Sequence, residues 1–188
     1  WRASFSGTPT TYDETAVPGD SVLFDDSATG TTTVALTTNL SPSAIIVDNA
    51  AKSYTFTGSG RLSVPAGLTK TGSGSLTLAN SGVNDFSGTV LLNGGTVRLD
   101  GTHDRLPAAA AVTLADAAGV SLDLNGFNQQ VGSLDGGGTA GGQITLGSGT
   151  LTVSGAGSTY AGVISGTGAL VKTNAGTQTL SGANTYQG

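Results

Sequence analysis

The imidazole of the single histidine is the side chain in this sequence that is best suited to proton transfer near neutral pH. His103 lies in a polar stretch between Asp100 and Asp104, and Arg105 follows. An imidazole held by carboxylates can serve as a general base or as a ligand. A zinc site, however, ordinarily takes several imidazole or thiolate ligands, and this chain of 188 residues has one histidine and no cysteine. We therefore expect His103 in a solvated turn, and we predict no catalytic, metal-binding or cofactor-binding residue.

Acidic side chains gather near the N-terminus, and closely spaced carboxylate oxygens are the ligands that calcium takes. Asp20, Asp25 and Asp26 lie within one short stretch, and Asp13 and Glu14 precede them. The stretch lacks the repeating Gly-x-Asp pattern of calcium-binding β-rolls. These aspartates are expected to cap a turn and to keep an edge of the structure soluble. Calcium binding by Asp20, Asp25 and Asp26 stays open as an alternative.

Charged residues also occur within segments that alternate polar and apolar side chains. Lys70, Arg98, Asp123 and Lys172 are expected to point outward from such segments into solvent. Sugar hydrolysis needs two carboxylates placed across the glycosidic bond, and no paired-carboxylate motif marks such a site. A shallow polysaccharide groove on this surface is an alternative, although solvated charges are the ordinary reason for the pattern.

The aromatic residues fall into two groups with different expected roles. Phe86, Tyr160 and Tyr186 each stand two residues before a glycine that restarts a strand, so we predict that they plug the core at equivalent positions. Trp1 and Tyr12 lie outside this pattern. They are the residues expected to contact a glycan if the protein binds one, because an exposed aromatic ring offers a stacking surface.

Short β-strands are indicated along nearly the whole chain by the alternation of apolar and polar residues. Leu122 and Leu124 share one face of such a segment, and Ser121 and Asp123 share the other. The same pattern occurs at 75–78, 96–99, 111–114, 143–146 and 150–153. Turns rich in glycine and asparagine separate the segments, and both residue types reach the positive φ that tight turns require.

The composition excludes several classes of protein. Glycine occupies 31 positions, which argues against a helical bundle. Apolar residues make up 37% and the net charge is only −5, so the chain does not have the composition of a disordered protein. No basic cluster for nucleic acid and no apolar run long enough to span a membrane is present.

Many short alternating strands are compatible with a β-sandwich or with a solenoid. A sandwich needs bulky residues to fill the space between two sheets. The inward positions here are mainly leucine, valine, isoleucine and alanine, which suit the narrow core of a β-helix. We therefore predict an all-β parallel solenoid of roughly seven to nine turns.

An internal repeat supports this prediction. The segment 67–88 matches 169–188, with Leu68, Lys70 and Gly74 aligned to Leu170, Lys172 and Gly176, and 149–162 is a third, partial copy. The two longer copies are far apart in the chain, and several strands lie between them.

The segment 168–188, GALVKTNAGTQTLSGANTYQG, strongly resembles the autotransporter-associated β-strand repeat, also called the passenger-associated transport repeat. The segments 86–99 and 120–153 resemble the sequence that follows such repeats, and the resemblance covers most of 56–188. It implies a right-handed parallel β-helix from the passenger of a surface-exposed or secreted bacterial protein. The repeats of this family carry no catalytic residues, so none is transferred.

These observations define a single elongated segment, with residues 1–30 capping the first turn and 31–188 forming the solenoid. We expect a non-catalytic stalk or spacer with an adhesive side, outside the cell or on its surface. Its expected partners are a surface glycan or another host or cell-surface ligand, together with flanking domains of a longer chain; nucleic acid and membrane are not among them. A carbohydrate-binding module attached to a polysaccharide-active enzyme is one alternative, and a polysaccharide-active β-helix enzyme is another.

Overall fold

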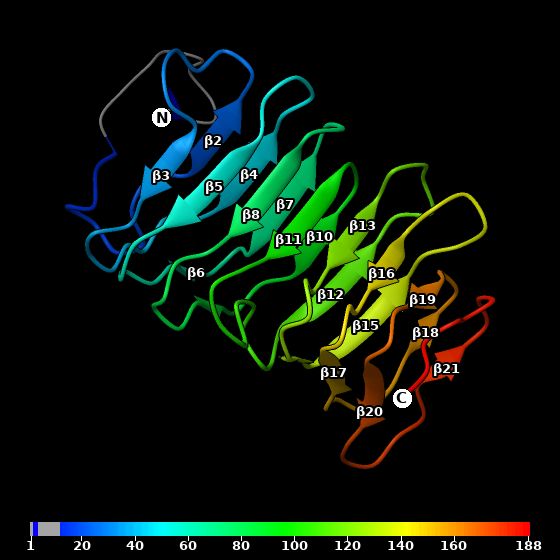
Figure 1. Cartoon of the computed structure of the whole chain (residues 1–188). Helices are drawn as coiled ribbons and strands as arrows, with labels where there is room; N and C mark the ends of the chain where they lie inside the picture. Colours follow the sequence, from blue (N-terminus) through cyan, green and yellow to red (C-terminus); the bar gives the residue numbers. More distant parts are fainter. Residues whose placement is uncertain (1, 4–11) are drawn as a thin grey trace.

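Alternating side chains produce short strands that stack in parallel from one turn of the chain to the next. The computed structural model describes residues 2–3 and 12–188, and those residues form strands and turns without a helix. Each turn places strands on the sides of a three-sided coil, which advances from the N-terminus to the C-terminus with a right-handed winding (Figure 1). The expected right-handed parallel β-helix is confirmed.

The first side of the coil is a nine-stranded sheet. Its strands, in spatial order, are β1 (Arg2–Ala3), β2 (Val22–Asp25), β4 (Ile45–Asp48), β7 (Leu68–Thr71), β10 (Val90–Leu92), β12 (Ala111–Leu114), β15 (Ser133–Gly136), β18 (Thr159–Tyr160) and β21 (Thr179–Leu180). Leu68 pairs with Val90, Val90 with Val112, and Val112 with Leu134, at equal steps along the chain. Successive turns in this part of the coil therefore take up the same length of chain.

The second side is a seven-stranded parallel sheet, so the coil has about seven full turns. Its strands are β3 (Thr33–Ala35), β5 (Tyr54–Thr57), β8 (Ser75–Leu78), β11 (Thr96–Leu99), β13 (Ser121–Asp123), β16 (Gln143–Thr145) and β19 (Ile164–Ser165). At about 4.8 Å between neighbouring strands, this side is roughly 30 Å long.

The third side consists of two short sheets separated by a turn without a strand. The first sheet holds β6 (Ser63–Val64) and β9 (Asp85–Phe86), and the second holds β14 (Gln129–Val131), β17 (Thr150–Val153) and β20 (Ala169–Lys172). The gap falls at Leu106 and Pro107, where proline has no N–H to donate to a strand ladder. Buried polar side chains supply the hydrogen bonds between successive turns there instead.

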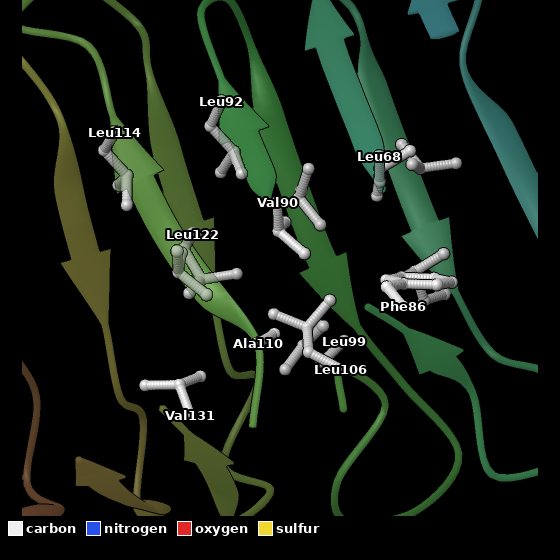
Figure 2. Close-up of a cluster of buried hydrophobic side chains, with 14 of the residues drawn as sticks. Leu68, Phe86, Val90, Leu92, Leu99, Leu106, Ala110, Leu114, Leu122 and Val131 are labelled. Carbon is white, nitrogen blue, oxygen red and sulfur yellow. The ribbon is translucent and has the colours of Figure 1, made fainter. Parts of the chain in front are cut away.

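The core is a narrow column filled by inward residues from the three sides. On the first side Ile45, Leu68, Val90, Val112 and Leu134 form one continuous inward ladder, and each is at most 1% exposed. Figure 2 shows the close packing of such side chains around the middle turns. Burying each of these residues contributes about 1.5–3 kcal/mol, so the stability of the coil accumulates turn by turn.

Glycine is required where the backbones of successive turns meet at a corner. Gly72 has φ of 68°, and a β-carbon on it would come within 2.2 Å of the carbonyl oxygen of Asn49 in the preceding turn. An alanine there would be strained and would also collide with backbone. Glycines at these corners thus allow successive turns of the coil to approach each other closely.

The N-terminal end differs from the rest of the coil because its pairing is not all parallel. Strand β1 pairs antiparallel with β2, while β2 pairs in parallel with β4. The segment 1–30, expected as a cap, therefore includes β2, which already belongs to the first side.

Candidate functional site

His103 lies on an exposed turn and connects two neighbouring turns of the coil. Its Nδ1 accepts a hydrogen bond from the backbone N–H of Asn128 at 2.8 Å, and its ring meets the Phe127 ring edge-on with centroids 5.8 Å apart. The neighbouring Asp104 accepts a hydrogen bond from the backbone N–H of Gln130 at 2.8 Å. These contacts give His103 a structural use that the sequence alone did not indicate.

The three N-terminal aspartates each satisfy backbone groups in separate places. Asp26 accepts hydrogen bonds from the backbone N–H groups of Ala50, Ala51 and Lys52 at 2.9–3.1 Å. These donors, chiefly those of Ala50 and Ala51, hold the pKa of Asp26 below its ordinary value. Asp25 accepts from the N–H of Ser27 at 2.9 Å, and Asp20 from the N–H of Asp13 at 3.3 Å. Among residues 2–3 and 12–188, no group of three or more His, Cys, Asp or Glu side chains is arranged to hold a metal ion.

Of the two residues proposed for glycan contact, Trp1 lies outside the described residues. Tyr12 is partly buried and packs against the core at its N-terminal end. Its hydroxyl donates a hydrogen bond to Glu14 at 3.0 Å, and burial together with this carboxylate raises the pKa of Tyr12. The ring therefore helps to close the end of the core, and glycan contact by Trp1 or Tyr12 stays a prediction.

The prediction that Lys70 points outward is wrong. Lys70 is 0% exposed, and its ammonium donates to the carbonyl oxygens of Thr71 at 2.5 Å, Gly72 at 2.9 Å and Gly94 at 3.2 Å. Burial lowers the pKa of Lys70 to about 8, against the opposing effect of Asp48 and Asp26. The three donors of the ammonium group thus satisfy carbonyls at a corner shared by two turns.

Lys172, the aligned lysine of the second copy, also donates to carbonyl oxygens. It reaches Gly155 at 2.7 Å, Asn174 at 3.3 Å, and Thr173. Lys172 is half-buried, however, because β20 is the last strand of its sheet. Both lysines therefore hold a corner of the backbone, and Lys172, which pairs with the buried Val153, does not point outward as predicted either.

A second polar network, which the sequence analysis missed, bridges the gap in the third side. Asn84 accepts a hydrogen bond from the Leu62 N–H at 3.0 Å and donates to the carbonyl of Arg105 at 2.8 Å. Gln129 accepts from the Leu106 N–H and donates to the Leu106 carbonyl, both at 2.9 Å. These side-chain amides replace the strand-to-strand hydrogen bonds that the third side lacks between β9 and β14.

The three aromatic residues expected at equivalent positions lie on different sides of the coil. Phe86 is 3% exposed and pairs with Val64 on the third side, whereas Tyr160 is 0% exposed and pairs with Gly136 and Leu180 on the first. Tyr186 is half-buried and follows Asn184, which bonds to the Ile164 N–H at the end of the second side. The expectation of core burial is right for Phe86 and Tyr160, but the expectation of one equivalent position is wrong.

The outer face of the second side carries hydroxyl groups in register from turn to turn. Along this outer ladder each residue pairs with the next, in the order Thr33, Thr55, Thr77, Arg98, Asp123, Thr145 and Ser165. A second ladder beside it runs through Ser75, Thr96, Ser121 and Gln143. The two ladders together form a polar track along the coil axis.

The centre of this track holds an ion pair with its own supports. Arg98 donates to Asp123 at 2.8 Å and to the side-chain carbonyl of Asn125 at 2.5 Å. Asp123 also accepts from the Asn125 N–H at 2.8 Å. Within the described part of the chain this is the one salt bridge, and it is solvent-exposed, with Arg98 45% and Asp123 22% exposed. The sequence placed both residues outward, as the structure does.

Residues 68–99 and 170–188 match the family described as Passenger-associated-transport-repeat. The whole chain is 37% identical, over 191 aligned residues, to the Adhesin BmaC autotransporter of Brucella suis biovar 1 (strain 1330). The chain spans about 5% of the length of that adhesin. No solved structure matches the chain significantly. Nor do the described residues include a helix long and apolar enough to cross a membrane.

This architecture is an elongated β-solenoid. It is a right-handed parallel coil whose turns have similar lengths and whose core is packed by ladders of aliphatic residues. Two segments of this β-solenoid match the passenger-associated-transport-repeat family, and the whole chain is similar to a segment of an autotransporter adhesin.

Proposed function

We propose that this chain is a non-catalytic, elongated structural segment with an adhesive side, displayed outside a bacterial cell or on its surface as part of an autotransporter-type protein. The observation that carries the proposal is the continuous coil of about seven turns, in which motif residues such as Lys70 and Asn84 serve the backbone. The similarity to a segment of an autotransporter adhesin supports the adhesive part.

The physical reason for a structural role is the way in which the coil uses its polar residues. Buried amides and ammonium groups bind carbonyl and N–H groups of neighbouring turns, which keeps successive turns in register. Such a segment presents a long outer surface that repeats regularly from one turn of the coil to the next. That surface, rather than a pocket, is where a binding activity would lie.

Beads coated with the purified chain test this proposal directly. Beads carrying the folded chain should be retained on cultured epithelial monolayers under flow, and beads carrying the heat-denatured chain should be washed away. Retention that does not depend on folding would contradict an adhesive side. Release of reducing ends from polysaccharides by the same preparation would contradict the non-catalytic role and favour the polysaccharide-active alternative.

A further inference from the structure

The polar track on the second side is built unlike the other long face of the coil. On the first side, the outer ladder runs through Leu23, Ile46, Thr69, Leu91, Thr113 and Asp135, and three of these six residues are aliphatic. On the second side, the outer ladder around Thr77 and Thr145 has no aliphatic residue. These two outer ladders have the same strand geometry but different chemistry, and only the ladder of the second side consists entirely of polar residues.

The ion pair at the centre of the track is not explained by stability. Exposed pairs contribute about 0–1 kcal/mol, so Arg98 and Asp123 add little to the fold. Their geometry is nevertheless fixed, because Asp123 also accepts from the Asn125 N–H and Arg98 also donates to Asn125. The guanidinium has five N–H donors and uses two in these contacts, while the carboxylate retains acceptor capacity. The pair can thus donate to and accept from adjacent hydroxyls of one ligand.

Neighbouring hydroxyl groups provide further hydrogen-bond donors and acceptors along the coil axis. The Thr96 and Ser121 hydroxyls are 2.8 Å apart, so one donates to the other and the donor still accepts. Thr77 precedes Arg98 in the ladder, and Thr145 follows Asp123. Polar groups therefore recur along the axis at the strand spacing of about 4.8 Å.

We propose that the outer face of the second side, centred on Arg98 and Asp123, binds an extended, uncharged, β-linked polysaccharide lying along the coil axis. The charges of the track cancel within it, and the chain as a whole has a net charge of −5, so the face suits a neutral polymer better than an anionic one. A straight face suits an extended polymer better than a helical one (Figure 1). This proposal deepens the adhesive role proposed above by naming its ligand class and its face.

Binding of soluble oligosaccharides to the full chain, measured by isothermal titration calorimetry, tests the proposal. Cellohexaose, xylohexaose and β-1,4-mannohexaose are the extended neutral probes, maltohexaose is the curved probe, and a hyaluronan hexasaccharide is the anionic probe. At least one extended neutral probe should bind, and its disaccharide should bind more weakly. The curved and anionic probes should bind more weakly or not at all.

Matched variants locate the site. Arg98→Ala should weaken binding about tenfold, as expected for the loss of a charge-assisted hydrogen bond, and Arg98→Lys should restore it only in part. Arg61→Ala removes another exposed arginine, and Thr113→Ala removes a threonine from the outer ladder of the first side, so neither should change affinity. Unchanged thermal melts would show that each variant is folded.

Three results would overturn the proposal: no binding of any extended neutral probe, tighter binding of hyaluronan or maltohexaose, or an equal effect of Arg98→Ala and Arg61→Ala. If the probes fail while coated beads are still retained on monolayers, the adhesive function stands and the ligand class is wrong. If bead retention also fails, the adhesive function is wrong as well.

Discussion

The two longer copies of the sequence motif have the same local chemistry but different surroundings. In the copy at 67–88, Lys70, Asn84 and Phe86 are buried, with at most 3% exposed. In the copy at 169–188, the aligned Lys172 and Asn184 are half-buried, although they make the same kinds of hydrogen bond to backbone. The motif therefore specifies the contacts, whereas burial comes from the turn that stacks on it.

The comparison also shows that the motif is not tied to one side of the coil. Leu68 lies on the first side, in β7, but its counterpart Leu170 lies on the third side, in β20. The length of a turn also varies, because the step from Tyr160 to its partner Leu180 is shorter than the step from Val97 to Leu122. The two copies therefore lie on different sides of the coil. The motif specifies a strand followed by a corner, and it does not specify the side on which they lie.

The largest difference between the copies is expected at their aromatic residues. Phe86→Ala should lower the free energy of unfolding by about 3–5 kcal/mol, because it opens a cavity beneath the third side. Tyr186→Ala, at the half-buried counterpart, should cost about 1 kcal/mol or less. Urea unfolding followed by circular dichroism measures both. Equal losses would mean that the following turn does not protect Phe86.

The asparagines should differ in the same direction by a smaller amount. Asn84→Ala leaves the Leu62 N–H and the Arg105 carbonyl without their partner in the interior, at a cost of about 2–3 kcal/mol. Asn184→Ala frees the Ile164 N–H near the end of the coil, where water can replace the amide, at a cost of about 1 kcal/mol. The same urea titrations give the two values, and a larger cost at Asn184 would refute the assignment of burial to the next turn.

The lowered pKa of Lys70 predicts that the free energy of unfolding rises with pH. Below pH 8 its ammonium is present in the folded and the unfolded chain, so the cost of burying the charge is fully felt. Above a folded pKa of about 8, the folded chain has released the proton that the unfolded chain keeps up to about 10.5. Stability should therefore increase by about 2 kcal/mol between pH 7 and 9.5.

The test of this pH dependence is urea unfolding at several pH values between 7 and 9.5. The rise should disappear in Lys70→Met and should persist in Lys172→Met, which retains Lys70. If both variants keep the rise, another group is responsible for it.

The smallest effect is expected at His103, on an exposed turn outside both motif copies. His103→Ala removes one acceptor for the Asn128 N–H and one edge-on ring contact, and should cost about 0.5–1 kcal/mol. Thermal melts measured beside those of Arg61→Ala, an ordinary exposed site, would resolve this difference. A loss as large as that of Asn84→Ala would show that the turn is part of the core network.

The strand pattern could be read from the sequence because it depends on residues two apart. Leu122 and Leu124 are buried and Asp123 points outward, as their alternation predicts. Lys70 follows the same rule, since it is two residues after the buried Leu68. The prediction that Lys70 points outward therefore did not follow the alternation with Leu68. The carbonyls that accept its hydrogen bonds come partly from Gly94, in the next turn, which local sequence does not reveal.

Features that join different turns were the part that sequence reasoning could not supply. The amide network of Asn84 and Gln129 depends on which residues meet after a full turn, and turn lengths vary. The polar track of the second side has the same origin, because Thr77, Arg98 and Asp123 become neighbours only through the register. Alternation predicts that each points outward, but not that they share one ladder.

The equal length of the turns between Leu68 and Leu134 has a consequence for the order in which the chain folds. Leu68, Val90, Val112 and Leu134 are joined by loops of equal length, so adding each of these turns closes a loop of the same size wherever it lies in the coil. The entropy of loop closure depends on loop length, so the cost of closing a loop does not grow as the rod lengthens. A chain that becomes available from one end can therefore add turns one after another, each using the previous turn as its template, without waiting for the remainder of the chain.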